Sequence, residues 1–282
     1  MPRLSEEKGV SMIKDLSSSG VEKINFVGGE PMLHPYLEAW IIIAKSCGLT
    51  TSIVSNGTRM TEEWLTKMRP NLDWLGLSID ASNDELHALM GRGLKGEITS
   101  GISKHLERSK EVWRLAQILG YGLKLNTVVT SVNIDDNMAK LIRSLKPHRW
   151  KIFRVLKIKG ENDGRVEPLL ISQGQFEDYM IRHRRILRDL EGTKIVGEDN
   201  DDMLGTYAMI DPQGRVYTNL HGRYCYSDQS VIEIGFSAAW SQVIEGFSEL
   251  RFDNRGGNWD WIRHDRIIHL PVVQGARNFH EV

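Results

Sequence analysis

The sequence predicts an α/β protein built on a parallel β-sheet. Short apolar segments rich in β-branched residues alternate with amphipathic segments over residues 5–157, and the first three apolar segments end at glycine, asparagine or aspartate. The 282 residues are 40% hydrophobic and 26% charged, so the chain is long enough to bury a sizeable core. Strands and helices that alternate at this spacing are typical of right-handed βαβ units, in an incomplete β/α barrel or a doubly wound sheet.

Five strands are predicted in the first part of the chain, over residues 24–27, 51–55, 74–79, 123–129 and 150–156. The helices predicted around them cover residues 5–18, 36–46, 101–119 and 134–145, and two more begin at Thr61 and at the capping-box sequence of residues 82–85. The first predicted element is therefore a helix, although a parallel α/β domain usually begins with a strand.

The pattern changes after residue 157. A polar loop over residues 160–171 precedes a charged helix that begins at Ser172 and ends near residue 190. Strands over 207–210 and 215–218 flank a hairpin turn at Asp211-Pro212-Gln213-Gly214. A helix near 238–246 and an ordered loop over 251–261 are expected to follow.

Charge and cysteine content exclude several classes of protein. The formal net charge is −1, so the chain as a whole is not attracted electrostatically to nucleic acid or to an anionic membrane. No apolar run reaches the roughly 20 residues of a spanning helix, and the first residues do not resemble a signal peptide, so a cytoplasmic location is expected. The two cysteines, Cys47 and Cys225, exclude a disulfide scaffold and a zinc or iron–sulfur site built from the chain's own three or four thiolates.

Polar and glycine residues follow the predicted strands at the ends where β/α barrels carry their active residues. They are Gly28-Gly29-Glu30-Pro31, Ser55-Asn56-Gly57, Ser78, Asp80 and Asn126. Paired glycines allow a ligand to approach the backbone closely. A plain turn would explain the glycine pair alone, but the polar groups at three other strand ends favour a ligand site.

Basic residues form a second set of candidates. Lys23 and Lys124 lie within strands, Arg149 and Lys151 flank Trp150 at the head of a strand, and Arg92 lies in Gly91-Arg92-Gly93. Each residue alone could lie at a strand edge in water. As a group directed into one lumen they would repel one another, and the phosphate chain of a ligand would relieve that repulsion.

These segments resemble the viperin family of radical-SAM enzymes, which are S-adenosylmethionine-dependent nucleotide dehydratases. Gly28-Gly29-Glu30-Pro31 matches the family's S-adenosylmethionine motif. Segments similar to viperin ones follow in viperin order and include residues 22–31, 52–57, 91–93, 124–126, 149–151 and 160–162. The similarity covers roughly residues 3–261. No Walker motif or Rossmann fingerprint is present, so another enzyme on a β/α scaffold is disfavoured.

The resemblance implies roles for the candidate residues. S-adenosylmethionine would bind Gly28, Gly29, Glu30 and Pro31, with Ser55, Asn56, Ser78, Asp80 and Asn126. A nucleoside triphosphate (CTP, UTP or GTP) would bind Lys23, Lys124, Arg149, Lys151, Arg92 and Tyr207. The family's product is a 3′-deoxy-3′,4′-didehydro nucleotide that terminates viral polymerisation.

The resemblance also implies a domain plan: a partial (β/α)6 radical-SAM barrel over residues 1–158 that lacks its first strand and cluster loop, a C-terminal α+β extension over 159–261 that completes the nucleotide pocket, and a tail over 262–282 of unknown role.

One family feature is missing. The C-x3-C-x2-C loop that holds a [4Fe–4S] cluster would precede residue 5, and Cys47 and Cys225 cannot replace it. Two explanations stay open. The sequence is a truncated form of an enzyme whose full-length form would need an electron donor, or it is a cluster-free paralogue that binds nucleotide, S-adenosylmethionine or a partner without catalysis. An exposed sheet edge would disfavour the second.

Overall fold

The computed structural model describes residues 4–220 and 222–257. Its larger sheet has six strands, all parallel and hydrogen-bonded in chain order. They are β1 (Lys23–Phe26), β2 (Thr50–Ser55), β3 (Trp74–Ser78), β4 (Gly122–Val129), β5 (Arg149–Arg154) and β6 (Lys194–Glu198). The predicted α/β class and incomplete barrel are confirmed, since β1 and β6 do not pair with each other in the described part of the chain.

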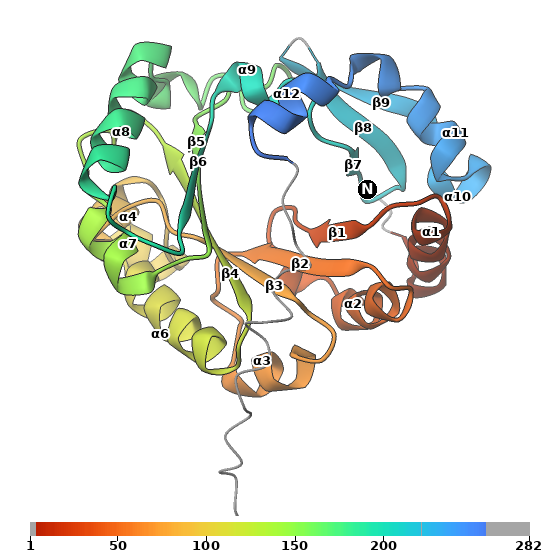
Figure 1. Ribbon diagram of the computed structural model, residues 1–282, viewed down its shortest axis with the longest axis horizontal. Coiled ribbons are helices and arrows are strands. Elements are labelled where there is room, and N and C mark those ends of the chain that lie inside the picture. Colours follow the sequence, from red (N-terminus) through yellow and green to blue (C-terminus); the bar gives the residue numbers. More distant parts are fainter. Residues whose placement is uncertain (1–3, 221, 258–282) are drawn as a thin grey trace, which may run out of the picture.

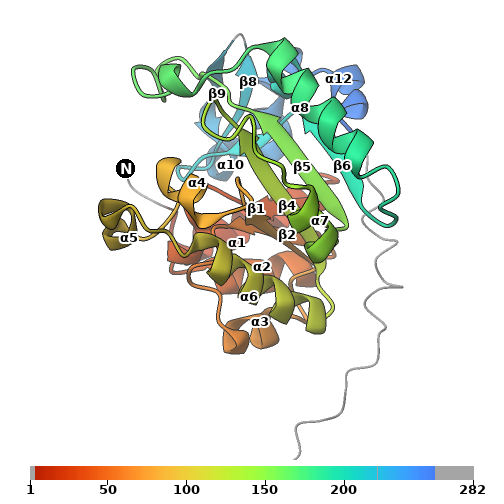
Figure 2. The same ribbon diagram turned by 90° about the vertical axis from the view of Figure 1, so that its left-hand side faces the viewer.

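Helices cover the outer side of this sheet, and the two views in Figures 1 and 2 show them arranged around it. They are α1 (Glu6–Ser18), α2 (Leu37–Ser46), α3 (Glu62–Met68), α4 (Asp84–Leu89), α5 (Lys95–Ser100), α6 (His105–Ile118), α7 (Ala139–Leu145) and α8 (Gln173–Ile186), with short 3-10 turns at Pro31–Leu33 and Glu167–Leu169. Thr61, Asn83 and Ser172 cap three of these helices through their side chains. None of the helices described is long and apolar enough to cross a membrane.

Strand β6 is a difference from the prediction, because the sequence pattern indicates no sixth parallel strand. Its sequence has a charged residue at each end and Gly197 inside, which hides the usual strand signal. Tertiary packing explains the strand: Ile195 packs against the main core, and a Cβ at position 197 would lie 2.7 Å from Cε of Met180. The loop predicted over 251–261 is also wrong for residues 251–254, which belong to α12.

A smaller antiparallel sheet follows, made of β7 (Met209–Ile210), β8 (Arg215–Leu220) and β9 (Arg223–Ser230). The predicted hairpin turn joins β7 and β8. Val216 packs with α1 and with the short helices after β9, and the backbone N–H of Leu4 donates to Pro212. In Figure 1 this sheet lies between β6 and α1, on the side where the parallel sheet is open. The remaining elements are α9 (Asn200–Met203), α10 (Val231–Ile234), α11 (Phe236–Ser241), a 3-10 turn at Ile244–Gly246 and α12 (Glu249–Asn254).

The two faces of the parallel sheet differ in chemistry because side chains alternate along each strand. The outer face, toward the helices, is a continuous apolar core that includes Ile53, Leu75, Leu125 and Trp150. The opposite face, called the inner face below, carries the alternate positions. It contains most of the polar and basic residues of the strands, including Lys23, Asn25, Ser52, Lys124, Asn126, Arg149, Lys151 and Glu198.

Candidate functional site

Basic residues share one region of the inner face. Lys124 on β4 and Arg149 on β5 are direct neighbours in the sheet register, and their exposed fractions are 4% and 2%. One pleat farther toward the carboxyl ends, Lys151 is the register partner of Asn126, which is in turn the partner of Ser78. The structure therefore brings together cations that the sequence separates by up to 128 positions, since Lys23 is electrostatically coupled to Lys124, Lys151 and Arg149.

The Lys124 side chain crosses a neighbouring strand. Its Nζ atom donates to Oγ of Ser52 at 2.7 Å and lies 3.5 Å from Oδ1 of Asn25, on β2 and β1. Strand β3 lies between, and a Cβ at Gly76 would be 3.3 Å from Cε of Lys124. Gly76 therefore leaves the space over which the lysine stem passes.

Burial and like charge disfavour the protonated state of these lysines. Burial, with Lys151 and Arg149 nearby, lowers the pKa of Lys124 to about 7. Burial also lowers the pKa of Lys151 to about 8, even though Glu198 acts in the opposite direction. Burial and three neighbouring cations lower the pKa of Lys23. A polyanion bound at this face would restore the charged state of all three.

Glu198, at the carboxyl end of β6, is the buried counter-charge in this region. Its carboxylate pairs with Nζ of Lys151 at 2.5 Å and accepts from Nη1 of Arg255 at 3.1 Å and from the hydroxyl of Tyr207. Although burial raises its pKa, Lys151 and Arg255 outweigh that effect and hold the pKa of Glu198 below its usual value. The predicted residues Lys151 and Tyr207 thus meet at a carboxylate that the sequence pattern did not indicate.

The segment around α12 completes this end of the site. The guanidinium of Arg255 lies 4.0 Å above the Tyr207 ring and donates to the carbonyl of Thr206 at 2.6 Å. Nη2 of Arg149 donates to the carbonyl of Gly256 at 2.6 Å. Arg255 is 6% exposed. The sequence does not indicate a role for Arg255, because Arg255 lies in a stretch predicted as a loop. The role becomes visible only in the structure, where the segment around α12 lies against β6.

The glycine turn after β1 is held by its own glutamate. Glu30 accepts from Oγ of Ser55 at 2.7 Å, from the backbone N–H of Asn56 at 2.9 Å and from that of Met32 at 3.1 Å. Gly28 has φ of +132°, and a Cβ at Gly28 or Gly29 would meet no atom within 4 Å. The carboxylate of Glu30 therefore joins β1 to β2, while the glycine backbone faces open space at the carboxyl end of the sheet.

The remaining candidates for S-adenosylmethionine binding differ in whether the protein already satisfies their polar atoms. Asp80 accepts from the backbone N–H of Val128 at 2.7 Å and from Nε of Arg92 at 2.5 Å, so these two residues, predicted to contact different ligands, form an ion pair with each other. By contrast, Oδ1 of Asn126 is buried and has no hydrogen-bond partner within the described ranges. Such an orphaned acceptor, beside Ser78 and Lys151 in the register, fits a ligand with donor groups.

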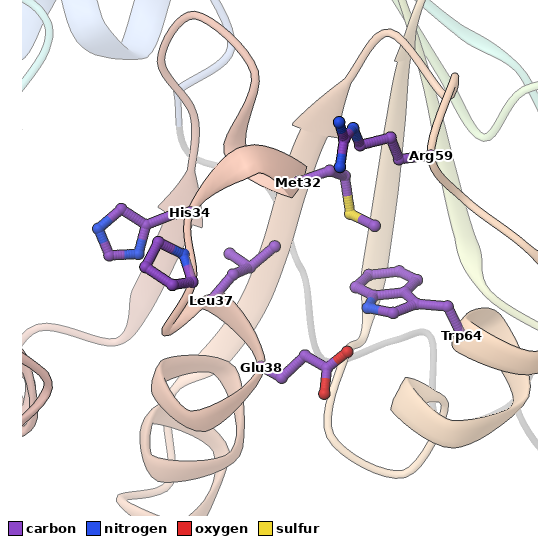
Figure 3. A pocket seen from close by; sticks show the side chains of 7 residues that line it. Met32, His34, Leu37, Glu38, Arg59 and Trp64 are labelled. Atoms are coloured by element: carbon purple, nitrogen blue, oxygen red, sulfur yellow. The ribbon is translucent and has the colours of Figure 1, made fainter.

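A separate pocket lies on the helix side of the sheet, beside the glycine turn. It has a volume of about 360 Å³ and is lined by Met32, His34, Pro35, Leu37, Glu38, Arg59 and Trp64. Figure 3 shows Arg59, Glu38 and Trp64 around it. Met32, Leu37 and Trp64 also pack against the outer core, so this pocket is distinct from the inner-face cations.

Comparison with known proteins places this chain in a family. The Radical SAM superfamily matches residues 1–171. An S-adenosylmethionine-dependent nucleotide dehydratase from Flammeovirga pacifica is 35% identical over 258 residues, which cover 92% of this chain and 84% of that protein. The chain belongs to the radical SAM nucleotide dehydratases. A second such dehydratase, from Lacinutrix mariniflava, is 35% identical, and this chain spans 52% of its length.

Solved structures support the radical SAM fold. The structure of anSMEcpe with bound AdoMet and Cp18Cys peptide aligns with a TM-score of 0.67 at 16% identity, over 92% of this chain and 79% of that one. SuiB from Streptococcus suis bound to S-adenosylmethionine gives a TM-score of 0.64 at 12% identity, over 89% of this chain and 61% of that one. At these identities the likeness concerns the fold.

The family's [4Fe–4S] cluster does not fit the residues of this dehydratase chain. Its two cysteines lie at the end of α2 and on β9, where Cys225 is the register partner of Thr218. The described residues contain no group of three His, Cys, Asp or Glu side chains that could hold a metal. S-adenosylmethionine does fit, since the open glycine backbone follows β1 and the orphaned Asn126 acceptor lies on β4 of the same parallel sheet.

Proposed function

We propose that this nucleotide dehydratase binds a nucleoside triphosphate, CTP in first place with UTP and GTP as alternatives. Its triphosphate lies against Lys23, Lys124, Arg149 and Lys151. The observation that carries the proposal is the convergence of these four cations on one inner face, with the buried carboxylate of Glu198 beside Lys151. Charge-assisted hydrogen bonds to phosphate are the strong interactions such a site provides.

S-adenosylmethionine occupies the carboxyl ends of β1 to β4 in this proposal. The backbone of Gly28 and Gly29 contacts its methionine end, and Ser78 and Asn126 contact its polar groups. Glu30, Ser55 and Asn56 hold the glycine turn in place, as their hydrogen bonds indicate. The Asp80–Arg92 pair serves the same site indirectly by fixing the loop after β3 to β4.

The reaction that we propose for the family site is loss of water from the nucleotide ribose, which gives a 3′-deoxy-3′,4′-didehydro nucleotide for antiviral defence. The 282 residues of this chain include two cysteines, so they cannot supply three thiolates. We therefore propose that this polypeptide binds both ligands and does not cleave S-adenosylmethionine reductively. The second candidate is a cluster-free paralogue whose whole function is to bind nucleotide, S-adenosylmethionine or a partner without catalysis, and the count of two cysteines favours it.

Calorimetric titration tests the binding site. CTP is titrated into the wild-type chain and into Lys124→Met, which keeps the apolar stem over Gly76 and removes the charge. We expect affinity to fall at least tenfold, as for loss of one charge-assisted contact. The matched control, Lys67→Met, removes an exposed lysine that pairs with Glu38 on the helix side, and its affinity should not change. Equal affinities for wild type and Lys124→Met would refute the site.

Anaerobic iron–sulfur reconstitution tests the absence of cleavage. The reconstituted chain is incubated with S-adenosylmethionine, CTP and dithionite, and 5′-deoxyadenosine is quantified. We expect none above the level of a protein-free control. Cluster absorbance together with 5′-deoxyadenosine from this polypeptide would overturn that part of the proposal while leaving the binding sites intact.

A further inference from the structure

The small sheet β7–β9 has two unlike faces. Val216 and Ile210 pack against α1 and the helices after β9, which fixes that face as the covered one. Met209 and Tyr217 are register partners one position away, so strand alternation puts them on the opposite face. Tyr207 is two residues before Met209, in a segment that runs beside β8, since the backbone N–H of Gly205 donates to the carbonyl of Asn219 at 2.7 Å. Because the Tyr207 hydroxyl donates to Glu198 and its ring lies 5.6 Å from Nζ of Lys151, this face borders the proposed triphosphate site.

Three tyrosines lie together on this face. Tyr217 and Tyr226 are register partners with stacked rings whose centroids are 4.9 Å apart, and Tyr224 meets Tyr217 edge-on at 5.0 Å. The guanidinium of Arg215 lies 4.6 Å from the centre of the Tyr226 ring and supports it. All three rings are partly exposed, so each has aromatic surface that the protein does not cover.

Asn219 adds an unsatisfied polar group to the same face. It is the register partner of Tyr224 and is only 4% exposed. Its Oδ1 atom is buried and accepts no hydrogen bond from any residue in 4–220 or 222–257. A buried amide oxygen without a hydrogen-bond donor normally costs stability, so its presence beside partly exposed aromatic residues indicates a polar ligand with a flat, aromatic part.

We infer that the tyrosine face, defined as Tyr217, Asn219, Tyr224 and Tyr226, binds the base of the nucleotide whose triphosphate is held by Lys124 and Lys151. This inference rests on the proposed function, because the phosphate site places the nucleotide next to Tyr207. Stacking on tyrosine accepts any base, and the Asn219 amide can pair with a base edge. Burial raises the pKa of Tyr217 to about 12, so these rings remain neutral and do not repel the phosphates.

The test compares a ligand that has a base with one that has none. CTP and inorganic tripolyphosphate are titrated calorimetrically into wild type, Tyr217→Ala, Tyr226→Ala and the control Tyr217→Phe, which keeps the ring. We expect each alanine variant to bind CTP about tenfold more weakly, from the loss of one stacking contact, and to bind tripolyphosphate within about twofold of wild type. Tyr217→Phe should bind both ligands like wild type.

The outcomes separate this inference from the function on which it rests. If wild type binds both ligands and neither alanine variant loses CTP affinity selectively, the tyrosine face does not hold the base and the phosphate site stands. If wild type binds neither ligand, the proposed function fails and the inference fails with it. Because Tyr226 is the least enclosed of the three tyrosines, Tyr226→Ala keeps the test valid if thermal melting shows that Tyr217→Ala does not fold.

Discussion

Nζ of Lys124 on β4 lies 2.7 Å from Oγ of Ser52 on β2, although β3 separates their strands. The contact depends on Gly76, whose missing side chain leaves a path across β3. The lysine thus reaches the middle of the inner face instead of remaining beside its own strand. Lys124, Lys151 and Arg149 therefore share one small region. A change in the packing around any of them would shift the position of its charge.

The path across Gly76 gives the first prediction. In Gly76→Ala, the new Cβ would lie 3.0 Å from Cγ2 of Val54 and 3.3 Å from Cε of Lys124. We expect a loss of about 1–3 kcal/mol in unfolding free energy, typical of overpacking, and weaker CTP binding. Urea unfolding and calorimetry measure both. Gly174→Ala on α8, whose Cβ would meet no atom within 4 Å, is the matched control and should lose neither stability nor affinity.

The buried counter-charge gives a second prediction. Glu198→Gln keeps the shape of the side chain but removes the partner of Lys151 and Arg255. Breaking a buried ion pair on one side typically costs about 3–5 kcal/mol, so the melting temperature without ligand should fall. Added tripolyphosphate should raise it more in the variant than in wild type, because the anion replaces the lost charge. A smaller rise in the variant would contradict this account.

The lowered lysine pKa values predict how stability depends on pH. The pKa of Lys124 is about 7 and that of Lys151 is about 8, whereas both groups titrate near 10.5 when the chain is unfolded. Between these values the unfolded chain binds more protons, so stability without ligand rises with pH. Melting temperatures at pH 7 and pH 9 test this. Lys124→Met should show a smaller rise, and a wild-type melting temperature that falls over this range would contradict the assignment.

The hydrogen bonds that Glu30 accepts predict different effects on S-adenosylmethionine binding and on triphosphate binding. Ser55→Ala removes a donor to Glu30 and an acceptor of the backbone N–H of Gly57. Loss of these bonds should cost about 1–3 kcal/mol of stability and loosen the glycine turn. We expect S-adenosylmethionine affinity to fall severalfold, while tripolyphosphate affinity stays constant. An equal loss for both ligands would show that these hydrogen bonds support the whole site.

Much of this fold follows from local patterns, and the rest depends on contacts distant in sequence. Three of the five predicted strands end at glycine, asparagine or aspartate, and helices carry caps such as Thr61 and Ser172, so the sequence predicts these elements correctly. Strand β6 was missed because Gly197 and its terminal charges obscure it, and packing of Met180 compensates. Glu198 and Arg255 were missed for a similar reason: each looks like a surface charge until β6 and α12 come together.

The candidate site residues show the same distinction between local patterns and contacts distant in sequence. Strand alternation predicts that Lys23, Lys124, Arg149 and Lys151 share a face, and the register places Lys124 beside Arg149. The pairing of Asp80 with Arg92 was not predictable, since it depends on how the loop after β3 returns to the sheet. The roles of these residues toward S-adenosylmethionine and nucleotide stay predictions.

A crystal structure of the chain grown with CTP tests the central claim most directly. We predict that the triphosphate lies on the inner face, with phosphate oxygens at about 3 Å from Nζ of Lys124 and Lys151, the distance of a charge-assisted hydrogen bond. The Tyr207–Glu198 contact should persist beside it. Triphosphate bound elsewhere, for instance at Arg59 in the helix-side pocket, with the inner-face lysines unoccupied, would contradict the account.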